Sequence, residues 1–75
     1  MQFDRITIEQ GKLGGTPCIR GLRIPVATLV EMTAQGMTPE QIRQHLPDIQ
    51  GEDVAQALRY AAEAVREQTL PLVGA

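Results

Sequence analysis

The part of this chain that most constrains its fold is residues 17–26, which read Pro-Cys-Ile-Arg-Gly-Leu-Arg-Ile-Pro-Val. Its two prolines cannot lie inside a helix, because proline lacks the amide donor and clashes with the preceding turn. Pro25 does suit the start of a helix, where that donor is not needed. The residues between the prolines favour extended backbone, with Gly21 as a bend. The segment therefore predicts an extended arm that carries Arg20 and Arg23 and leads directly into a helix.

A second extended piece is predicted nearer the start of the chain. Residues 6–8, Ile-Thr-Ile, alternate apolar and polar side chains and are all β-branched, which is typical of a short strand. Glycines at positions 11, 14 and 15 predict turns between the two pieces. Proline in the second piece indicates an edge strand, whose open hydrogen-bonding groups can pair with another strand. Two arrangements are open: an arm exchanged between two chains, or an arm folded back on its own chain.

Two short helices are predicted after the arm. Residues 26–35 place apolar side chains on one face at helical spacing, and Gly36 follows as a usual residue just beyond a helix end. Residues 38–41, Thr-Pro-Glu-Gln, predict the start of the second helix, because threonine caps, proline suits the first turn and glutamine completes a capping box. This helix should run from Pro39 to about His45, before Pro47 stops it.

A third, longer helix is predicted over about residues 52–67. Its apolar side chains cover an arc of roughly 220°, beyond the ~100° stripe that a single core contact needs. Many of these side chains are small and allow a close approach by a neighbour. We therefore expect a helical interface with a second surface, formed by Ala57, Tyr60, Ala61 and Ala64.

These patterns predict one mainly α domain. It consists of a β arm over residues 1–25, a three-helix body over 26–67 and a loose tail over 68–75. The body resembles a helix-turn-helix unit of the homeodomain-like or winged-helix-like kind, with any small three-helix bundle as the alternative. A 75-residue chain buries only about 60% of its unfolded surface, and one cysteine allows no internal disulfide. Association is the remaining common route to stability, so we expect a homodimer or a constant partner.

Several classes of function are not favoured. No apolar run is long enough to span a bilayer and the N-terminus lacks the apolar core of a signal peptide, so we expect a cytoplasmic protein without membrane association. Cys18 and His45 are single and far apart, which predicts no metal site and no cofactor. Cys18 is expected to be a small buried hydrophobe. No catalytic constellation is visible, and we expect no enzyme.

The charge pattern points to the arm as the contact surface. The net charge is −2, but the arm is mildly basic and the helical body is acidic. Arg20 and Arg23 are therefore the candidates for nucleic-acid or partner contact. As alternatives, Arg23 would tie the arm to Asp53 or Glu52, and Arg20 would be an exposed surface residue. Because those two carboxylates also open the third helix, base reading by this helix is not favoured.

Three motifs in order resemble those of the small prokaryotic domain-of-unknown-function family 433, and the resemblance covers roughly residues 4–65. The motifs are Gly15-Thr16-Pro17 with Pro17-x-Ile19-x-Gly21-x-Arg23-Ile24-Pro25-Val26, then Gly36-x-Thr38-x-Glu40-x-Ile42, and then Glu52-Asp53-Val54-x-x-Ala57-Leu58-x-Tyr60-Ala61. The chain departs from the pattern at Leu22, where threonine is common, and at residues 50–51, where a Ser/Thr helix cap is usual. Loss of that cap should cost about 1 kcal/mol.

The resemblance implies a helix-turn-helix-like body with a short N-terminal β portion. It also implies an antitoxin of a toxin–antitoxin pair, whose partner would be a PIN-like ribonuclease and which could bind operator DNA to repress its own genes. No catalytic residues carry over from the family. The alternative is a protein–protein interaction or dimerisation module that does not bind DNA. Salt dependence separates the two, because phosphate contacts weaken steeply with added salt.

Overall fold

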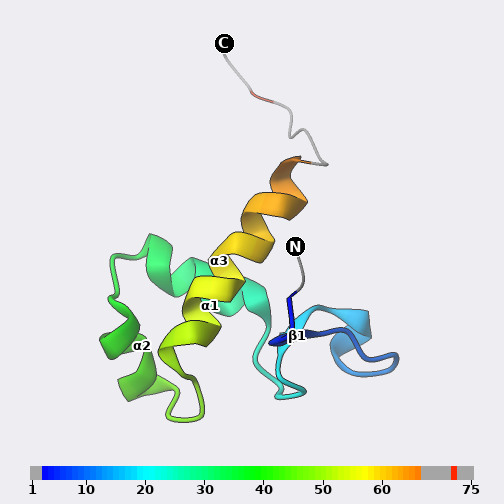
Figure 1. Ribbon diagram of the computed structural model, residues 1–75, viewed down its shortest axis with the longest axis horizontal. Helices are drawn as coiled ribbons and strands as arrows, with labels where there is room; N and C mark the ends of the chain where they lie inside the picture. The colour runs from blue at the N-terminus through cyan, green and yellow to red at the C-terminus, as the bar shows by residue number, and fades with distance from the viewer. Residues whose placement is uncertain (1–2, 67–71, 73–75) are drawn as a thin grey trace.

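The computed structural model describes residues 3–66 and Leu72. The elements follow in the order β1 (Ile6–Thr7), a 3₁₀ turn η1 (Leu13–Gly15), β2 (Cys18–Ile19), α1 (Val26–Ala34), α2 (Pro39–His45) and α3 (Gly51–Arg66). Figure 1 shows α1 and α3 crossing at the centre, with the β arm to one side of them and α2 to the other. The mainly helical fold with a short N-terminal β arm is confirmed. Apart from Leu72, the predicted tail over 68–75 lies outside the described residues.

The arm folds back on its own chain. β1 and β2 pair antiparallel, with Ile6 opposite Ile19 and Thr7 opposite Cys18. Cys18 also forms a bridge with Pro25, so the segment that leads into α1 runs back along β2. The bend between them is made as predicted, by Gly21, whose φ of +72° is in the left-handed region that favours glycine. Of the two arrangements left open by the sequence, this chain therefore shows the self-paired one.

The end of α1 is fixed by a glycine. α1 ends at Ala34, one residue before the predicted end, and Gly36 beyond it has a φ of +92°. The amide of Met37 donates to the carbonyl of Met32 at 3.2 Å, which is the longer bond of a Schellman motif. The backbone therefore reverses here and sends the chain into α2.

The start of α2 follows the sequence signal in detail. The Thr38 hydroxyl accepts from the Gln41 amide at 3.2 Å, and the Gln41 side chain accepts from the Thr38 amide at 2.9 Å. Pro39 occupies the first turn, and the helix ends at His45. The predicted capping box and both predicted helix bounds are confirmed.

The core lies where α1 and α3 pack together, with α2 and the arm closing its edges. Its buried apolar members come from every part of the fold: Ile19, Val26, Leu29, Ile42, Ile49, Val54 and Ala57. Ile19 is fully buried, so the arm contributes to the core as well as to the surface. Beside the core, the rings of Phe3 and Tyr60 meet edge to face at 5.2 Å between centroids. Among the described residues, no helix is both long and apolar enough to cross a membrane.

Candidate interaction surface

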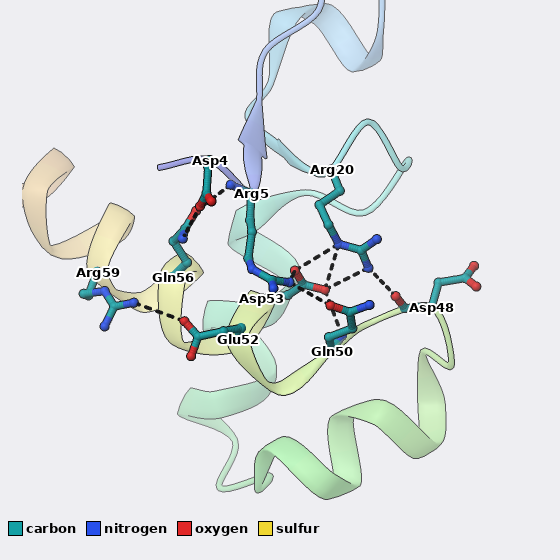
Figure 2. A network of polar contacts seen from close by, with 9 residues as sticks. All are labelled: Asp4, Arg5, Arg20, Asp48, Gln50, Glu52, Asp53, Gln56 and Arg59. Carbon is teal, nitrogen blue, oxygen red and sulfur yellow. Dashed lines mark hydrogen bonds and ion pairs between the residues drawn. The ribbon is translucent and has the colours of Figure 1, made fainter. Parts of the chain in front are cut away.

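A buried carboxylate joins the arm to α3. Asp53 lies in the first turn of α3 and is fully buried. Its Oδ1 accepts from Arg5 Nη1 at 2.9 Å, and its Oδ2 accepts from Arg20 Nη2 at 2.9 Å. Arg20 Nε lies 3.1 Å and 3.2 Å from the two carboxylate oxygens (Figure 2). Two arginines from the arm therefore converge on one acidic side chain of the helical body.

Asp53 also caps its own helix. Its Oδ2 accepts from the Gln50 amide at 2.8 Å, which is the bond that a residue at the third helical position makes back to the N-cap in a capping box. The sequence suggested a weak start at residues 50–51, because no Ser or Thr cap is present. The structure supplies the other half of a capping box, in which the Asp53 carboxylate satisfies the Gln50 amide, and the Asp53 amide donates to the Gln50 carbonyl at 2.9 Å.

The carboxyl of Asp53 is held in its charged form. Burial raises the pKa of this group, but hydrogen bonds from Arg20, from the Gln50 amide and from Arg5 outweigh burial and hold the pKa below its usual value. The hydrogen bond to Asp53 in turn raises the pKa of Arg20. The contact is therefore a true ion pair, and it is satisfied within the chain.

A second buried polar side chain, Gln56, holds the start of the arm. Its Oε1 accepts from the Arg5 amide at 2.6 Å, and its Nε2 donates to Asp4 Oδ1 at 2.9 Å. Among the described residues, every buried side-chain nitrogen and oxygen has a hydrogen-bond partner. The network in Figure 2 therefore attaches the arm to α3, and its buried polar groups all have partners within the chain.

The alternative in which Arg23 ties the arm to Asp53 or Glu52 is wrong. Arg23 is exposed and forms no ion pair with any described residue. Arg20 is exposed, as its own alternative expected, and its guanidinium also makes the tie to Asp53. The reason is the turn after β2. Arg20 itself adopts a positive φ of 44°, and its side chain reaches Asp53 with 32% of its area still exposed.

Arg5 was not predicted from the sequence to be part of this network. The pairing register of β1 and β2 nevertheless places it beside Arg20. Because Ile6 pairs with Ile19, the residue before β1 stands beside the residue after β2, and the Arg20 amide donates to the Arg5 carbonyl at 2.8 Å. Two arginines held side by side repel unless an anion lies between them. Asp53 is that anion.

An apolar groove lies between α1, α3 and the arm. Its volume is about 340 Å³. Its lining residues are Thr16, Pro17, Val26, Ala27, Val30, Glu31, Tyr60, Ala61 and Ala64. A smaller hollow lined by Phe3, Tyr60, Glu63 and Ala64 adjoins it, sharing Tyr60 and Ala64 with the groove. The C-terminal half of α3 thus carries an apolar surface that the other described residues leave unfilled.

Three of the four predicted interface residues line this groove: Tyr60, Ala61 and Ala64. Ala57 does not. It is fully buried in the core of its own chain, so it cannot contact a second chain. The apolar arc predicted for α3 is therefore divided, with Val54 and Ala57 packed in the core and Tyr60, Ala61 and Ala64 lining the groove.

The arginine network and the groove both involve the β arm. Pro17 lines the groove from the arm, and its carbonyl accepts from the Val26 amide at 3.0 Å. The same arm is held by pairing of β1 with β2, by Arg5 and Arg20 on Asp53, and by the hydrogen bonds of Gln56. Fastening the arm to α3 therefore sets the position of one wall of the groove.

The exposed start of α3 offers little to a nucleic acid. Glu52 is exposed there and pairs with Arg59 at 3.7 Å, while Asp53 is buried under the two arginines. The start of α3 consequently presents paired charges, whereas binding to phosphates requires free cations. Within residues 3–66 and Leu72, no group of three His, Cys, Asp or Glu side chains could hold a metal ion.

These features define a small helical domain with a self-paired β arm and an apolar groove on its surface. The chain belongs to the family described as "Protein of unknown function (DUF433)", whose model matches residues 6–61. It is also similar to the crystal structure of a DUF433 member protein from Anabaena variabilis ATCC 29413, at 33% identity and a TM-score of 0.76 over 85% of this chain. The match spans 63% of that protein's length. No curated protein matches this chain.

Proposed function

We propose that this protein is a non-enzymatic, antitoxin-like protein that binds a partner protein in the groove between α1 and α3. The partner we propose is a PIN-like ribonuclease, and the complex would form in the cytoplasm. The observation that carries this proposal is the groove itself. Apolar side chains from three parts of the chain line it, and no other part of the described chain fills it.

The composition of the groove favours a protein over a small polar ligand. Pockets for small ligands combine an apolar lining with a small number of precisely placed polar groups that fix the orientation of the ligand. Here the lining side chains with polar atoms are Thr16, Glu31 and Tyr60, and the Thr16 hydroxyl already donates to the Leu13 carbonyl at 2.7 Å. Tyr60 is half-buried at one edge, and tyrosine is enriched among the residues that dominate protein interfaces.

The test is inhibition of a PIN-like ribonuclease encoded beside the gene for this protein. Wild-type protein, the groove variant Ala61→Arg and the control Ala62→Arg would each be titrated into the nuclease assay. Ala62 is exposed one residue further along α3 and does not line the groove. We expect inhibition by the wild type and the control, and loss of inhibition with Ala61→Arg. A nuclease that remains fully active at excess wild-type protein contradicts the proposal.

Self-association and DNA binding are the second candidates, and one observation favours the latter. Arg23 is exposed and has no ion-pair partner among the described residues, so it is available to a phosphate. Anisotropy titrations with labelled duplex from upstream of the gene would test this at low and physiological salt. An operator-binding protein should prefer that duplex over a scrambled one, lose affinity with salt, and bind more weakly as Arg23→Ala. Sedimentation of the free protein would report a homodimer.

A further inference from the structure

The acidic residue at the groove, Glu31, differs from the other glutamates within residues 3–66. Glu9, Glu40, Glu52 and Glu63 each have a cationic side chain within ion-pair distance. Glu31, which is exposed on α1 and lines the groove, has no such partner among the described residues. A surface charge without a partner costs nothing in water, but it becomes important once a second molecule covers it.

Any apolar occupant of the groove would bring Glu31 under partial cover. The occupant must then either leave this carboxylate in water or place a cation against it, because an unpaired charge that loses its water is penalised. A basic residue beside the apolar contact surface meets that requirement. The groove therefore selects by charge as well as by shape.

The form of the groove indicates what kind of segment carries that basic residue. On α1 the lining residues are Val26, Ala27, Val30 and Glu31, which span more than one helical turn and share one face. On α3 they are Tyr60, Ala61 and Ala64, again on one face. Two helix faces that leave an open trough accept a third helix, whose apolar side chains at helical spacing act as anchors. The small side chains of α3 permit a close approach.

We propose that the groove between α1 and α3 binds an amphipathic helix of the partner protein, and that a lysine or arginine flanking its apolar face pairs with Glu31. This inference rests on the proposed function for its choice of site. It adds the chemistry of the segment that the site recognises.

The test uses two alanine-based helical peptides of about 16 residues, each with leucines at three positions one helical turn apart. One peptide carries lysines beside the leucines and the other carries glutamates. Each would be titrated into isotopically labelled protein, with amide chemical shifts recorded for the wild type, for Glu31→Gln and for the control Glu40→Gln. Glu40 is an exposed glutamate on α2 and does not line the groove.

We expect the lysine peptide to shift amides of Val26, Val30, Ala61 and Ala64 and to bind more tightly than the glutamate peptide. Glu31→Gln should lower the affinity for the lysine peptide about threefold, because the ion pair it removes is exposed. Glu40→Gln should leave that affinity unchanged. Equal affinity for the two peptides would overturn the inference, and so would shifts that fall outside the groove. A wild-type dimer that Ala61→Arg converts to monomer, with no peptide shifts, would also overturn it, because a second copy would then fill the groove.

The two proposals fail separately. Lysine-selective peptide binding that depends on Glu31, together with an uninhibited nuclease, would contradict the proposed partner and leave the recognition chemistry standing. Nuclease inhibition that Ala61→Arg abolishes and Glu31→Gln leaves unchanged would contradict the inference about Glu31 and leave the proposed function standing.

Discussion

Arg20 and Asp53, 33 positions apart in the chain, share three contacts between a guanidinium and a carboxylate, at 2.9, 3.1 and 3.2 Å. A contact of this kind fixes orientation as well as distance, because the planar guanidinium presents its donors in a rigid fork. Since Arg20 follows β2 and Asp53 opens α3, this contact sets how the arm lies on the helical body.

Replacing the buried carboxylate should weaken the fold. Asp53→Asn keeps the shape of the side chain but removes the charge that two arginines share. It also changes an acceptor of the Gln50 amide. We expect the free energy of unfolding to fall by about 2 kcal/mol, the scale of hydrogen bonds to charged groups. Urea denaturation followed by circular dichroism measures this.

The control is Glu40→Gln, which removes a carboxylate from an exposed pair with Arg43 at 3.6 Å. An exposed pair of this kind contributes at most about 0.5 kcal/mol. Equal denaturation midpoints for the two variants would show that the Asp53 network is not important for stability.

The same carboxylate should make stability depend on pH in acid. Because the pKa of Asp53 is lowered in the folded protein, the unfolded chain binds protons more readily at low pH. The stability it contributes is complete above the unfolded pKa of about 3.9 and is lost as the pH falls through that value and then through the lowered folded pKa. Denaturation midpoints should therefore drop below about pH 4 in the wild type and drop less in Asp53→Asn. Parallel pH profiles for the two proteins would contradict this assignment.

Gln56 should act on the start of the arm more than on the helices. Gln56→Ala leaves the Arg5 amide without its acceptor and Asp4 without its donor. We expect the free energy of unfolding to fall by about 1–2 kcal/mol. We also expect faster hydrogen exchange at the Arg5 amide. Gln56→Glu keeps the acceptor but sets a carboxylate against Asp4, so it should protect the Arg5 amide better than alanine does. Identical exchange in both variants would argue against the bond.

Two glycines give a matched pair for backbone conformation. Gly36 ends α1 with a φ of +92°, and a methyl group there would meet nothing within 4 Å. Gly36→Ala should lower the free energy of unfolding by about 1 kcal/mol, because alanine is strained in the left-handed conformation. Gly51 opens α3, has similar space and does not have a positive φ. Gly51→Ala should therefore stabilise the protein, by about 0.5 kcal/mol, and destabilisation of similar size in both would contradict this reading.

Local signals predicted most of the fold. The capping box at Thr38 and Gln41, the glycine after α1 and the bend at Gly21 each depend on a few neighbouring residues, and all are present as expected. Helix periodicity likewise placed Tyr60, Ala61 and Ala64 on one surface, and they line the groove. These features need no knowledge of how distant segments meet.

Contacts between distant segments were less predictable. The sequence offered Arg20 and Arg23 as similar cations, three positions apart, and only the turn after β2 decides which of them reaches Asp53. Arg5 joins them through strand register, which local patterns did not specify. Ala57 shares the face of the interface residues by periodicity, but packing of α3 on α1 buries it. In each case the deciding factor was tertiary placement.

A hydrogen-exchange footprint of this protein, alone and with the proposed PIN-like ribonuclease, would locate the binding surface. If the groove is the binding surface, complex formation should slow exchange along α1 from Val26 to Glu31 and along α3 from Tyr60 to Ala64. Exchange in α2, on the other side of the fold in Figure 1, should not change. Protection confined to the arm around Arg23, or to α2, would contradict the account and would move the binding surface away from the groove.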